Sequence, residues 1–225
     1  MTPFALATGN AHKVQEICEI FSGRWGIALA AWAVPAGTET AGFLVSTPGD
    51  LAAAVRRLPT LDSPPDVEES GATLEANARI KAVGIGGALG LVAIADDTGL
   101  EVDALGGAPG VHSARYAGPT ATDADNCEKL LAELRGIGPK ARIARFATVA
   151  LAREPSGREV VATGAVEGRI VDEPRGSGGF GYDPVFAPSE GDGRTFAEMA
   201  AAEKHALSHR GRAFRALADL LRPPP

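Results

Sequence analysis

Apolar runs of strand length alternate, through the first half of the chain, with segments that carry apolar residues at helical spacing. The apolar runs are residues 3–8, 27–34 and 91–95, and the helical spacing occurs at residues 11–21 and 74–89. Strands that alternate with helices are typical of an α/β fold. The last apolar run is followed at once by Asp96 and Asp97, so we expect its strand to end there.

The second half of the chain predicts a further helix, a pair of strands and a terminal helix. Thr122 is an N-cap, with Asp125 in the position that a capping box requires. Residues 143–152 and 158–171 predict two strands joined by a turn, and residues 203–221 predict the last helix. The whole pattern indicates an α/β protein with a mixed sheet.

Segments rich in glycine, proline and threonine separate these elements. We interpret them as loops, at residues 35–66, 105–121 and 173–184, with a short helix at 51–58. Thr73 is the expected N-cap of the helix at 74–89, whose last turns are weakened by glycines. No internal repeat or linker divides the chain, so we expect a single domain over residues 1–225.

The composition is that of a globular protein and excludes several function classes. Hydrophobic residues make up 45% of the 225 residues and charged residues 22%, which is enough to form a core. The net charge of −6 argues against a binder of duplex DNA, but it leaves small phosphate ligands open. With no signal-peptide pattern and no apolar stretch of about 18 residues, the sequence predicts a cytoplasmic protein without a membrane segment.

Lysine and cysteine are scarce in this chain. Three of the five lysines, Lys13, Lys81 and Lys204, fall within candidate motifs. Arginine is abundant, so we expect lysine where a compact ammonium is needed. Cys18 and Cys127 match no metal-binding spacing, and we interpret them as buried thiols.

Residues 8–13 (Thr-Gly-Asn-Ala-His-Lys) join the first predicted strand to the first helix. Backbone N–H groups and the positive end of the helix dipole meet at such a turn, which suits a phosphate. Lys13 lies one turn into the helix and can reach the same ligand. The alternative is a capped helix start with a surface lysine.

Acidic residues precede the helix that contains Lys81. One of the carboxylates of Glu68, Glu69 and Glu75 can ligate a divalent cation while Lys81 faces an anion. The alternative is an acidic helix entrance that favours the helix dipole, with Lys81 on a solvated face.

Asp96 and Asp97 stand at the carboxyl end of an apolar strand, where ligands collect in open α/β sheets. Because side chains alternate along a strand, we expect the two carboxylates on opposite sides. One can bind a metal ion or act as a base while the other bonds to the scaffold. The alternative is a polar turn.

Two segments near the C-terminus combine aromatic and cationic residues. Residues 180–183 (Phe-Gly-Tyr-Asp) can stack on a base and meet its polar edge, or form only a tight turn. Lys204, His209 and Arg210 can together bind a base carbonyl and phosphate oxygens, or form only a charged helix face.

Taken in this order, the segments resemble the inosine triphosphate pyrophosphatase family, whose members hydrolyse non-canonical purine nucleoside triphosphates. The shared motifs stand at residues 7–13, 69–82, 95–110, 113–118, 178–186 and 208–213. Six ordered motifs that run nearly from end to end make the resemblance specific. The chain departs from the family by an extra segment within residues 33–60, to which we assign no role.

The resemblance implies an elongated mixed sheet flanked by helices, with two lobes, a central active-site cleft and a homodimer. It implies hydrolysis of ITP, dITP and XTP to the monophosphate and pyrophosphate with Mg²⁺. Asp97 would be the proton acceptor and, with Glu68 or failing that Glu69, a metal ligand. The substrate would be bound by Thr8, Gly9, Asn10, Ala11, His12, Lys13, Lys81, Thr98, Phe180, Gly181, Tyr182, Asp183, Lys204, His209 and Arg210.

Two other functions remain open at the level of the sequence. One is a related nucleotide pyrophosphatase with another base preference, and the other is a non-catalytic nucleotide sensor. The Asp96-Asp97 pair and the motif lysines count against a sensor, because binding alone needs no base beside a metal ion. Donors such as His209 and Arg210 would favour a 6-carbonyl over the 6-amino group of adenine.

Overall fold

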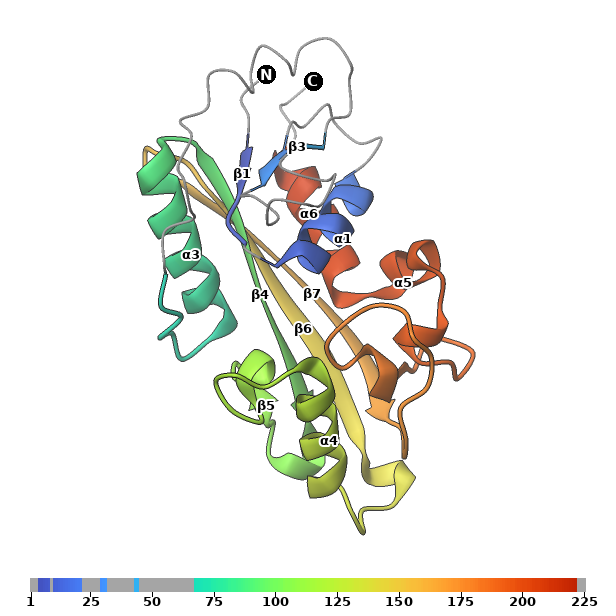
Figure 1. Ribbon diagram of the computed structural model, residues 1–225. Coiled ribbons are helices and arrows are strands. Elements are labelled where there is room, and N and C mark those ends of the chain that lie inside the picture. Colours follow the sequence, from blue (N-terminus) through green and yellow to red (C-terminus); the bar gives the residue numbers. More distant parts are fainter. Residues whose placement is uncertain (1–3, 9, 22–28, 32–42, 45–66, 222–225) are drawn as a thin grey trace. The chain divides into compact units, whose positions relative to one another are not determined.

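The computed structural model describes residues 4–8, 10–21, 29–31, 43–44 and 67–221 (Figure 1). Its strands are β1 (Phe4–Leu6), β2 (Leu29–Ala31), β3 (Phe43–Leu44), β4 (Val92–Val102), β5 (Pro109–Gly110), β6 (Ile143–Arg153), β7 (Glu159–Ile170) and β8 (Phe186–Pro188). Its helices are α1 (Ala11–Phe21), α3 (Leu74–Leu89), α4 (Asp123–Glu133), α5 (Ala201–Leu207) and α6 (His209–Leu221).

The strands form one mixed sheet in the order β3-β2-β1-β4-β6-β7-β8, with β5 paired to β4. Strand β1 runs parallel to β2 and to β4, whereas the pairs β2–β3, β4–β5 and β7–β8 are antiparallel. This arrangement confirms the α/β class and the mixed sheet that the sequence predicts.

The helix starts follow the predicted capping residues. The Thr73 hydroxyl accepts the N–H of Ala76 at 3.1 Å and begins α3. Thr122 and Asp125 form a reciprocal capping box at the start of α4, in which the Asp125 carboxylate accepts the Thr122 N–H at 2.8 Å. Each cap satisfies backbone donors that the first turn of a helix leaves without an intrahelical partner.

Three predictions of element boundaries were wrong. Strand β4 continues through Asp96 and Asp97, because each carboxylate finds a lysine partner there. The terminal helix is broken at Ser208, whose extended backbone ends α5 and whose hydroxyl accepts the N–H of Gly211 at 3.0 Å. The predicted loops at 35–66 and 105–121 contain the short strands β3 and β5, and the helix predicted at 51–58 lies outside the described residues.

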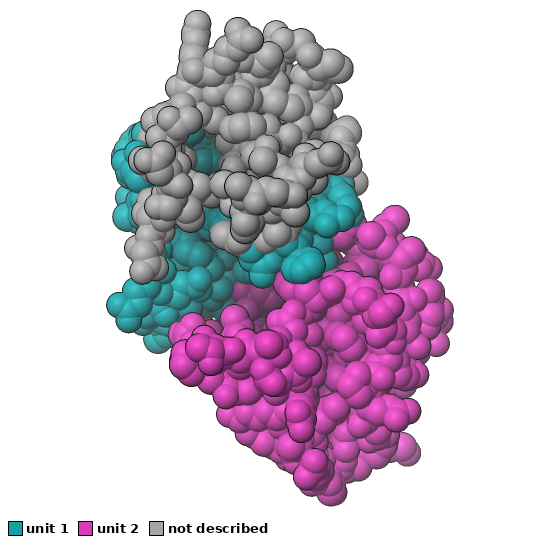
Figure 2. All heavy atoms as spheres, in the orientation of Figure 1, with its two compact units in different colours: residues 1–97, 149–163, 213–225 teal, residues 98–148, 164–212 magenta. Residues whose placement is uncertain are grey.

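The chain forms two compact units, drawn in different colours in Figure 2. Unit 1 comprises residues 1–97, 149–163 and 213–225, and unit 2 comprises residues 98–148 and 164–212. Strands β4, β6 and β7 each contribute residues to both units.

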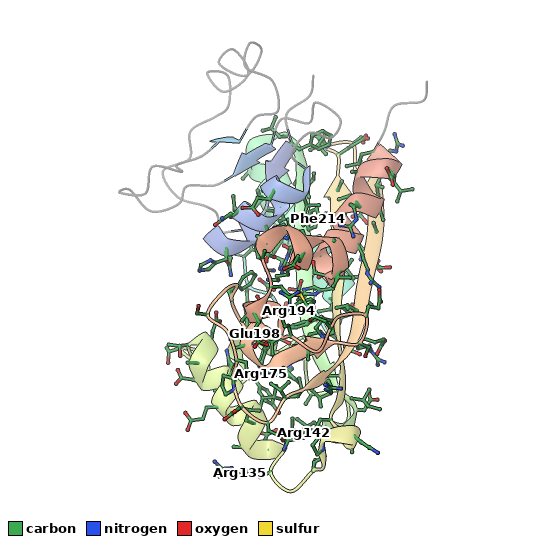
Figure 3. The ribbon with its side chains drawn as sticks, turned by 90° about the vertical axis from the view of Figure 1, so that its right-hand side faces the viewer. Arg135, Arg142, Arg175, Arg194, Glu198 and Phe214 are labelled. Carbon is green, nitrogen blue, oxygen red and sulfur yellow. The ribbon has the colours of Figure 1, made fainter. Side chains whose placement is uncertain are left out.

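In unit 1, helices cover both faces of the sheet. Ile94 and Leu6 pack in one cluster with α1 and α6, where Phe214 (Figure 3) is fully buried. Their strand neighbours Ala93 and Ala95 face the other way, into a cluster with α3. A strand buried on both faces needs a continuous apolar run, which explains why residues 91–95 do not alternate with polar ones.

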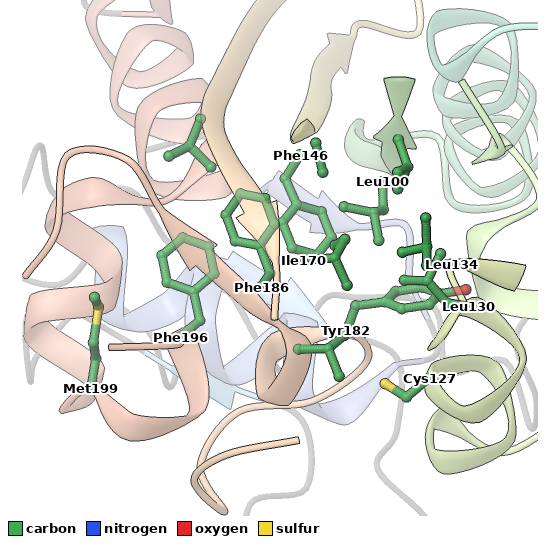
Figure 4. Close-up of a cluster of buried hydrophobic side chains, with 14 residues drawn as sticks. Leu100, Cys127, Leu130, Leu134, Phe146, Ile170, Tyr182, Phe186, Phe196 and Met199 are labelled. Atoms are coloured by element: carbon green, nitrogen blue, oxygen red, sulfur yellow. The ribbon is translucent and has the colours of Figure 1, made fainter. Parts of the chain in front are cut away.

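In unit 2, the long strands alternate between buried and exposed residues. Even-numbered positions of β7 from 164 to 170 are buried and odd-numbered positions from 165 to 169 are exposed. The buried side packs with α4 and an aromatic group in which the rings of Phe146 and Phe186 meet edge to face, 4.7 Å apart (Figure 4). Period-two burial of this kind is the pattern of a sheet that is covered on one face.

Charged side chains cross-link the segment between β8 and α5. Arg175 donates to the Gly193 carbonyl at 2.8 Å, and Arg194 donates to the Glu198 carbonyl at 3.4 Å (Figure 3). The first contact ties this segment to the loop that follows β7, and the second joins two parts of the segment. Among the described residues, none of the helices combines the length and the apolar character that crossing a membrane requires.

Two glycine substitutions test the packing, because they are expected to change the free energy of unfolding in opposite directions. A Cβ at Gly87 in α3 would meet nothing within 4 Å, so Gly87→Ala should raise the free energy of unfolding by about 0.5–1 kcal/mol through helix propensity. A Cβ at Gly168 would lie 2.5 Å from the Ala187 carbonyl oxygen, so Gly168→Ala should lower it by about 1–3 kcal/mol. Urea unfolding followed by circular dichroism measures both, and equal effects of the two substitutions would contradict this packing.

Candidate active site

Asp96 and Asp97 are both buried within β4, at 1% and 7% exposure. The Asp96 carboxylate lies 3.0 Å from the Nζ of Lys13 on α1. The Asp97 carboxylate lies 3.1 Å from the Nζ of Lys81 on α3. Because α1 and α3 cover opposite faces of the unit 1 sheet, the two carboxylates point in opposite directions, as the alternation along a strand predicts.

Both carboxylate oxygens of Asp97 are engaged. Lys81 donates to Oδ1 at 3.1 Å, and the side-chain amide of Asn77 donates to Oδ2 at 3.2 Å. Lys81 also donates to Oε2 of Glu69 at 3.1 Å, so one ammonium group joins two carboxylates from different segments. The neighbouring Glu68 side chain is exposed.

The pKa values in this group follow from burial and charge. Burial raises the pKa of the Asp97 carboxyl, and the positive charges of Lys81 and Lys13 do not fully offset it. Burial lowers the pKa of Lys81, but the negative charges of Asp96, Asp97 and Glu69 outweigh burial and raise it overall. A carboxylate with a raised pKa beside a permanent cation has the character expected of a general base.

Asn77 connects the acidic loop to Asp97, and sequence reasoning assigned it no role. Its side chain is fully buried, and its amide oxygen accepts the Gly71 N–H at 2.7 Å while its amide nitrogen donates to Asp97. A Cβ at Gly71 would lie 2.6 Å from that amide oxygen, so only glycine allows this contact. The asparagine therefore fixes the loop that carries Glu69 relative to the carboxylate of Asp97.

The turn at residues 8–13 is organised by Asn10. Its side-chain oxygen accepts the N–H groups of His12 and Lys13, at 3.0 and 3.2 Å, and thereby caps α1. The Thr8 hydroxyl accepts the N–H of Asn10 at 3.2 Å. Gly9 and the side chain of Ala11 lie outside the described residues, and His12 is exposed.

The donor chemistry around Lys81 fits a divalent cation with oxygen ligands. Carboxylate oxygens of Asp97 and Glu69 converge on one positive charge, each at 3.1 Å. Within the part of the chain that the structure describes, no three His, Cys, Asp or Glu side chains gather where they could together hold a metal ion. Two protein carboxylates suit a hard divalent cation that keeps several of its water ligands.

A second group of predicted site residues comes together in unit 2, around Phe180. The Lys204 ammonium lies 5.1 Å and the Arg210 guanidinium 5.3 Å from the centre of the Phe180 ring. The Asp183 carboxylate is buried, accepts the Phe180 N–H at 2.8 Å and pairs with Lys204 at 2.5 Å. These two contacts of the Asp183 carboxylate hold the loop backbone at Phe180 and the side chain of Lys204 in place.

Thr98 and His209 occupy different surroundings in unit 2. Arg210 donates to the Thr98 hydroxyl at 3.2 Å. The buried His209 ring stacks on Phe146, with centroids 4.5 Å apart and planes at 19°. Sequence reasoning missed Phe146, since only the fold brings that strand position to the histidine.

Helix α4 and the turn that begins at Ser113 also contact the loop at residues 180–183. Asp123 accepts the Gly181 N–H at 2.7 Å, the Cys127 thiol donates to the Gly181 carbonyl at 3.4 Å, and the Tyr182 hydroxyl donates to the Ser113 carbonyl at 2.9 Å. Burial raises the pKa of the Cys127 thiol to about 12, which confirms the interpretation of this cysteine as a buried thiol. The side chain of Cys18 lies outside the described residues.

The chain is similar to known proteins over nearly its whole length. The sequence model of the Ham1 family matches residues 4–220. A dITP/XTP pyrophosphatase of Streptomyces coelicolor is 42% identical over 99% of this chain and 98% of its own. A Ham1 protein from Coxiella burnetii has a similar structure, with a TM-score of 0.77 at 35% identity over 98% of both chains. A nucleoside-triphosphatase described as a dITP/XTP pyrophosphatase from Mycobacterium abscessus gives a TM-score of 0.66 at 38% identity, over 98% of this chain and all of its own.

The Asp183–Lys204 pair provides a stability prediction. Asp183→Asn leaves the buried Lys204 ammonium without its carboxylate, and we expect a loss of about 3–5 kcal/mol in the free energy of unfolding. Asp192→Asn is the control, because the Asp192–Arg194 pair is exposed and water screens its charges, so its removal should change the free energy of unfolding far less. Urea unfolding of both variants measures the difference, and similar losses would show that burial does not strengthen the pair.

Proposed function

Because the chain belongs to the Ham1 family, we propose that it hydrolyses the non-canonical purine nucleoside triphosphates ITP, dITP and XTP to the nucleoside monophosphate and pyrophosphate. Three curated relatives that are 42–44% identical over nearly the whole chain are named dITP/XTP pyrophosphatases, which supports this proposal. The observation that carries the proposal is that the carboxylates of Asp97 and Glu69 both lie 3.1 Å from the Lys81 ammonium. The proposed base, Asp97, therefore lies beside the proposed metal site. Removal of these nucleotides would keep deaminated bases out of the nucleotide pool.

We assign the phosphate chemistry to the residues of unit 1. Water attacks the α-phosphorus, the bond between the α-phosphorus and the bridging oxygen breaks, and pyrophosphate leaves. Asp97 accepts the proton of the attacking water, and its raised pKa supports that role. Lys13, Lys81 and the turn at residues 8–13 neutralise the charge on the leaving pyrophosphate.

Asp97 and the Glu68-Glu69 pair would hold Mg²⁺, and the contact of Glu69 with Lys81 favours Glu69 over the exposed Glu68. A bound Mg²⁺ would polarise the phosphoryl oxygens and the attacking water. While Asp97 bonds to Lys81, its base strength is held down by the ammonium charge. Displacement of that ammonium toward a phosphate would release the carboxylate for proton transfer.

We assign base recognition to the residues of unit 2. A purine stacked on Phe180 would present its 6-position to Lys204 and Arg210, whose side chains only donate hydrogen bonds. A 6-carbonyl accepts such bonds, whereas the 6-amino group of adenine opposes another donor. His209, Gly181, Tyr182 and Asp183 complete the proposed pocket, and Thr98 contacts the substrate beside them.

We further propose that residues 1–225 act as one domain, as a homodimer in the cytoplasm, on free nucleotides. The dimer follows from the resemblance to the inosine triphosphate pyrophosphatase family, and the cytoplasm from the resemblance and the sequence. The preference for free nucleotides is supported by the net charge of −6, since a duplex-binding surface needs an excess of basic residues.

The base preference is tested with a panel of nucleotides. We expect pyrophosphate release from dITP and XTP to exceed release from dATP by at least about a hundredfold in kcat/KM, because a site of donors rejects an amino group. A coupled pyrophosphate assay with and without Mg²⁺ measures the rates. Equal hydrolysis of dATP, or release of orthophosphate alone, would contradict the proposal.

The role of Asp97 is tested by Asp97→Asn. The amide cannot accept a proton from water, so we expect kcat to fall by at least about a hundredfold while the circular dichroism spectrum is unchanged. Asp103→Asn is the matched control, because Asp103 immediately follows the same strand and is exposed. Near-normal turnover of the Asp97 variant would remove this residue from the mechanism.

A further inference from the structure

Thr148 is a polar side chain in the core, and it belongs to none of the sequence motifs. It lies on β6 at 1% exposure, and its hydroxyl oxygen is 2.6 Å from the hydroxyl oxygen of Thr98. A buried hydroxyl is costly unless it is hydrogen-bonded, and valine would fill almost the same space without that cost. The contact with Thr98 therefore gives the threonine at this position a physical reason.

Thr98 connects Thr148 to Arg210. The Arg210 guanidinium, which can only donate, lies 3.2 Å from the Thr98 oxygen, so that oxygen is the acceptor. The same oxygen also bonds to the Thr148 hydroxyl, and either hydroxyl can supply the proton of that bond. All three side chains belong to unit 2.

The donor in the Thr98–Thr148 bond decides where the Thr98 hydrogen points. If Thr98 donated, its hydrogen would lie along the bond into the core. If Thr148 donates, the Thr98 oxygen accepts from both Thr148 and Arg210, and its own hydrogen is directed away from both. Only the second arrangement allows Thr98 to donate to an oxygen of a bound nucleotide.

We propose that Thr148 is a positioning residue that donates to Thr98 and thereby aims the Thr98 hydroxyl at the nucleotide. The inference rests on the proposed function, in which Thr98 contacts the substrate. Carbonyl and phosphoryl oxygens of a nucleotide only accept hydrogen bonds, so a hydroxyl that binds one of them must donate. A hydroxyl held in that direction before binding avoids the entropy that a free rotor would lose.

A double-mutant cycle tests the inference. The variants are Thr148→Val, Thr148→Ser, Thr98→Val and the double valine variant. The dissociation constant of dITP is measured by calorimetry in EDTA, and KM and kcat are then measured with Mg²⁺. Thr148→Val should raise the dissociation constant and KM about tenfold with kcat within about twofold, whereas Thr148→Ser should remain near wild type.

The cycle separates a positioning role from a structural one. In the Thr98→Val background, Thr148→Val should change the dissociation constant by less than about twofold, because no hydroxyl remains to be aimed. An equal loss in both backgrounds, or failure of Thr148→Ser to restore binding, would overturn the inference. If Thr148→Val does not fold, Thr148→Ala replaces it with the same expectations.

Thr195→Val is the matched control. Thr195 is also fully buried in unit 2, but its hydroxyl donates to the Arg175 carbonyl at 2.8 Å. This substitution should lower the unfolding midpoint and leave the dissociation constant of dITP within about twofold; an equal loss of affinity would overturn the inference.

The same measurements distinguish failure of the inference from failure of the proposed function. A wild-type enzyme that binds dITP and releases no pyrophosphate would contradict the function, while the binding cycle would still decide the role of Thr148. A wild-type enzyme that neither binds dITP nor hydrolyses it with Mg²⁺ would overturn both.

Discussion

The burial of two consecutive carboxylates inside one strand is the constraint on which unit 1 depends. Asp96 and Asp97 point to opposite faces of a sheet that is covered by helices on both sides, so each face must supply its own cation. An isolated buried charge is costly, so the pairs with Lys13 and Lys81 stabilise the two carboxylates inside the strand. The same ammonium groups suit phosphate oxygens, so the residues that stabilise the strand are also the ones that can bind a triphosphate.

Hydrogen bonds made by an uncharged side chain connect this pair of carboxylates to the acidic loop. Asn77 uses one end of its amide for Gly71 and the other for Asp97, and it is fully buried. A charged residue at this position would add to the local imbalance of charge, whereas the amide orders two segments without changing it. The position of Glu69 relative to Asp97 is therefore set by a residue that touches no phosphate.

Local signals in the sequence predicted most elements, and they failed where distant partners decide the outcome. The caps at Thr73 and Thr122 need only residues within one helical turn. The end predicted for the strand at Asp96 was wrong because its cation comes from α1, a segment that no local rule connects to β4. The break at Ser208 could have been predicted, since serine is a favoured N-cap, but the continuous helical pattern across it concealed the signal.

In the candidate site as well, the sequence predicted residues within motifs and missed residues whose partners are distant in the chain. The motifs predicted Asp97, Lys81 and the aromatic loop, because the resemblance assigns roles to whole segments of the chain. They did not predict the residues that hold those groups in place, such as Asn77, because supporting contacts cross between strands and helices. Such contacts appear only once the register of the sheet is known.

The glycine-rich loop of unit 2 follows from the burial of a third carboxylate. Asp183 accepts the Phe180 N–H and pairs with Lys204, and a Cβ at Gly179 would lie 2.0 Å from its carboxylate oxygen. Gly179 also has a φ of +69°, which residues with a side chain rarely adopt. The loop must therefore approach the carboxylate as bare backbone, and that approach places Phe180 beside Lys204. In both units, a buried acid that needs partners fixes the geometry of the residues proposed to bind the substrate.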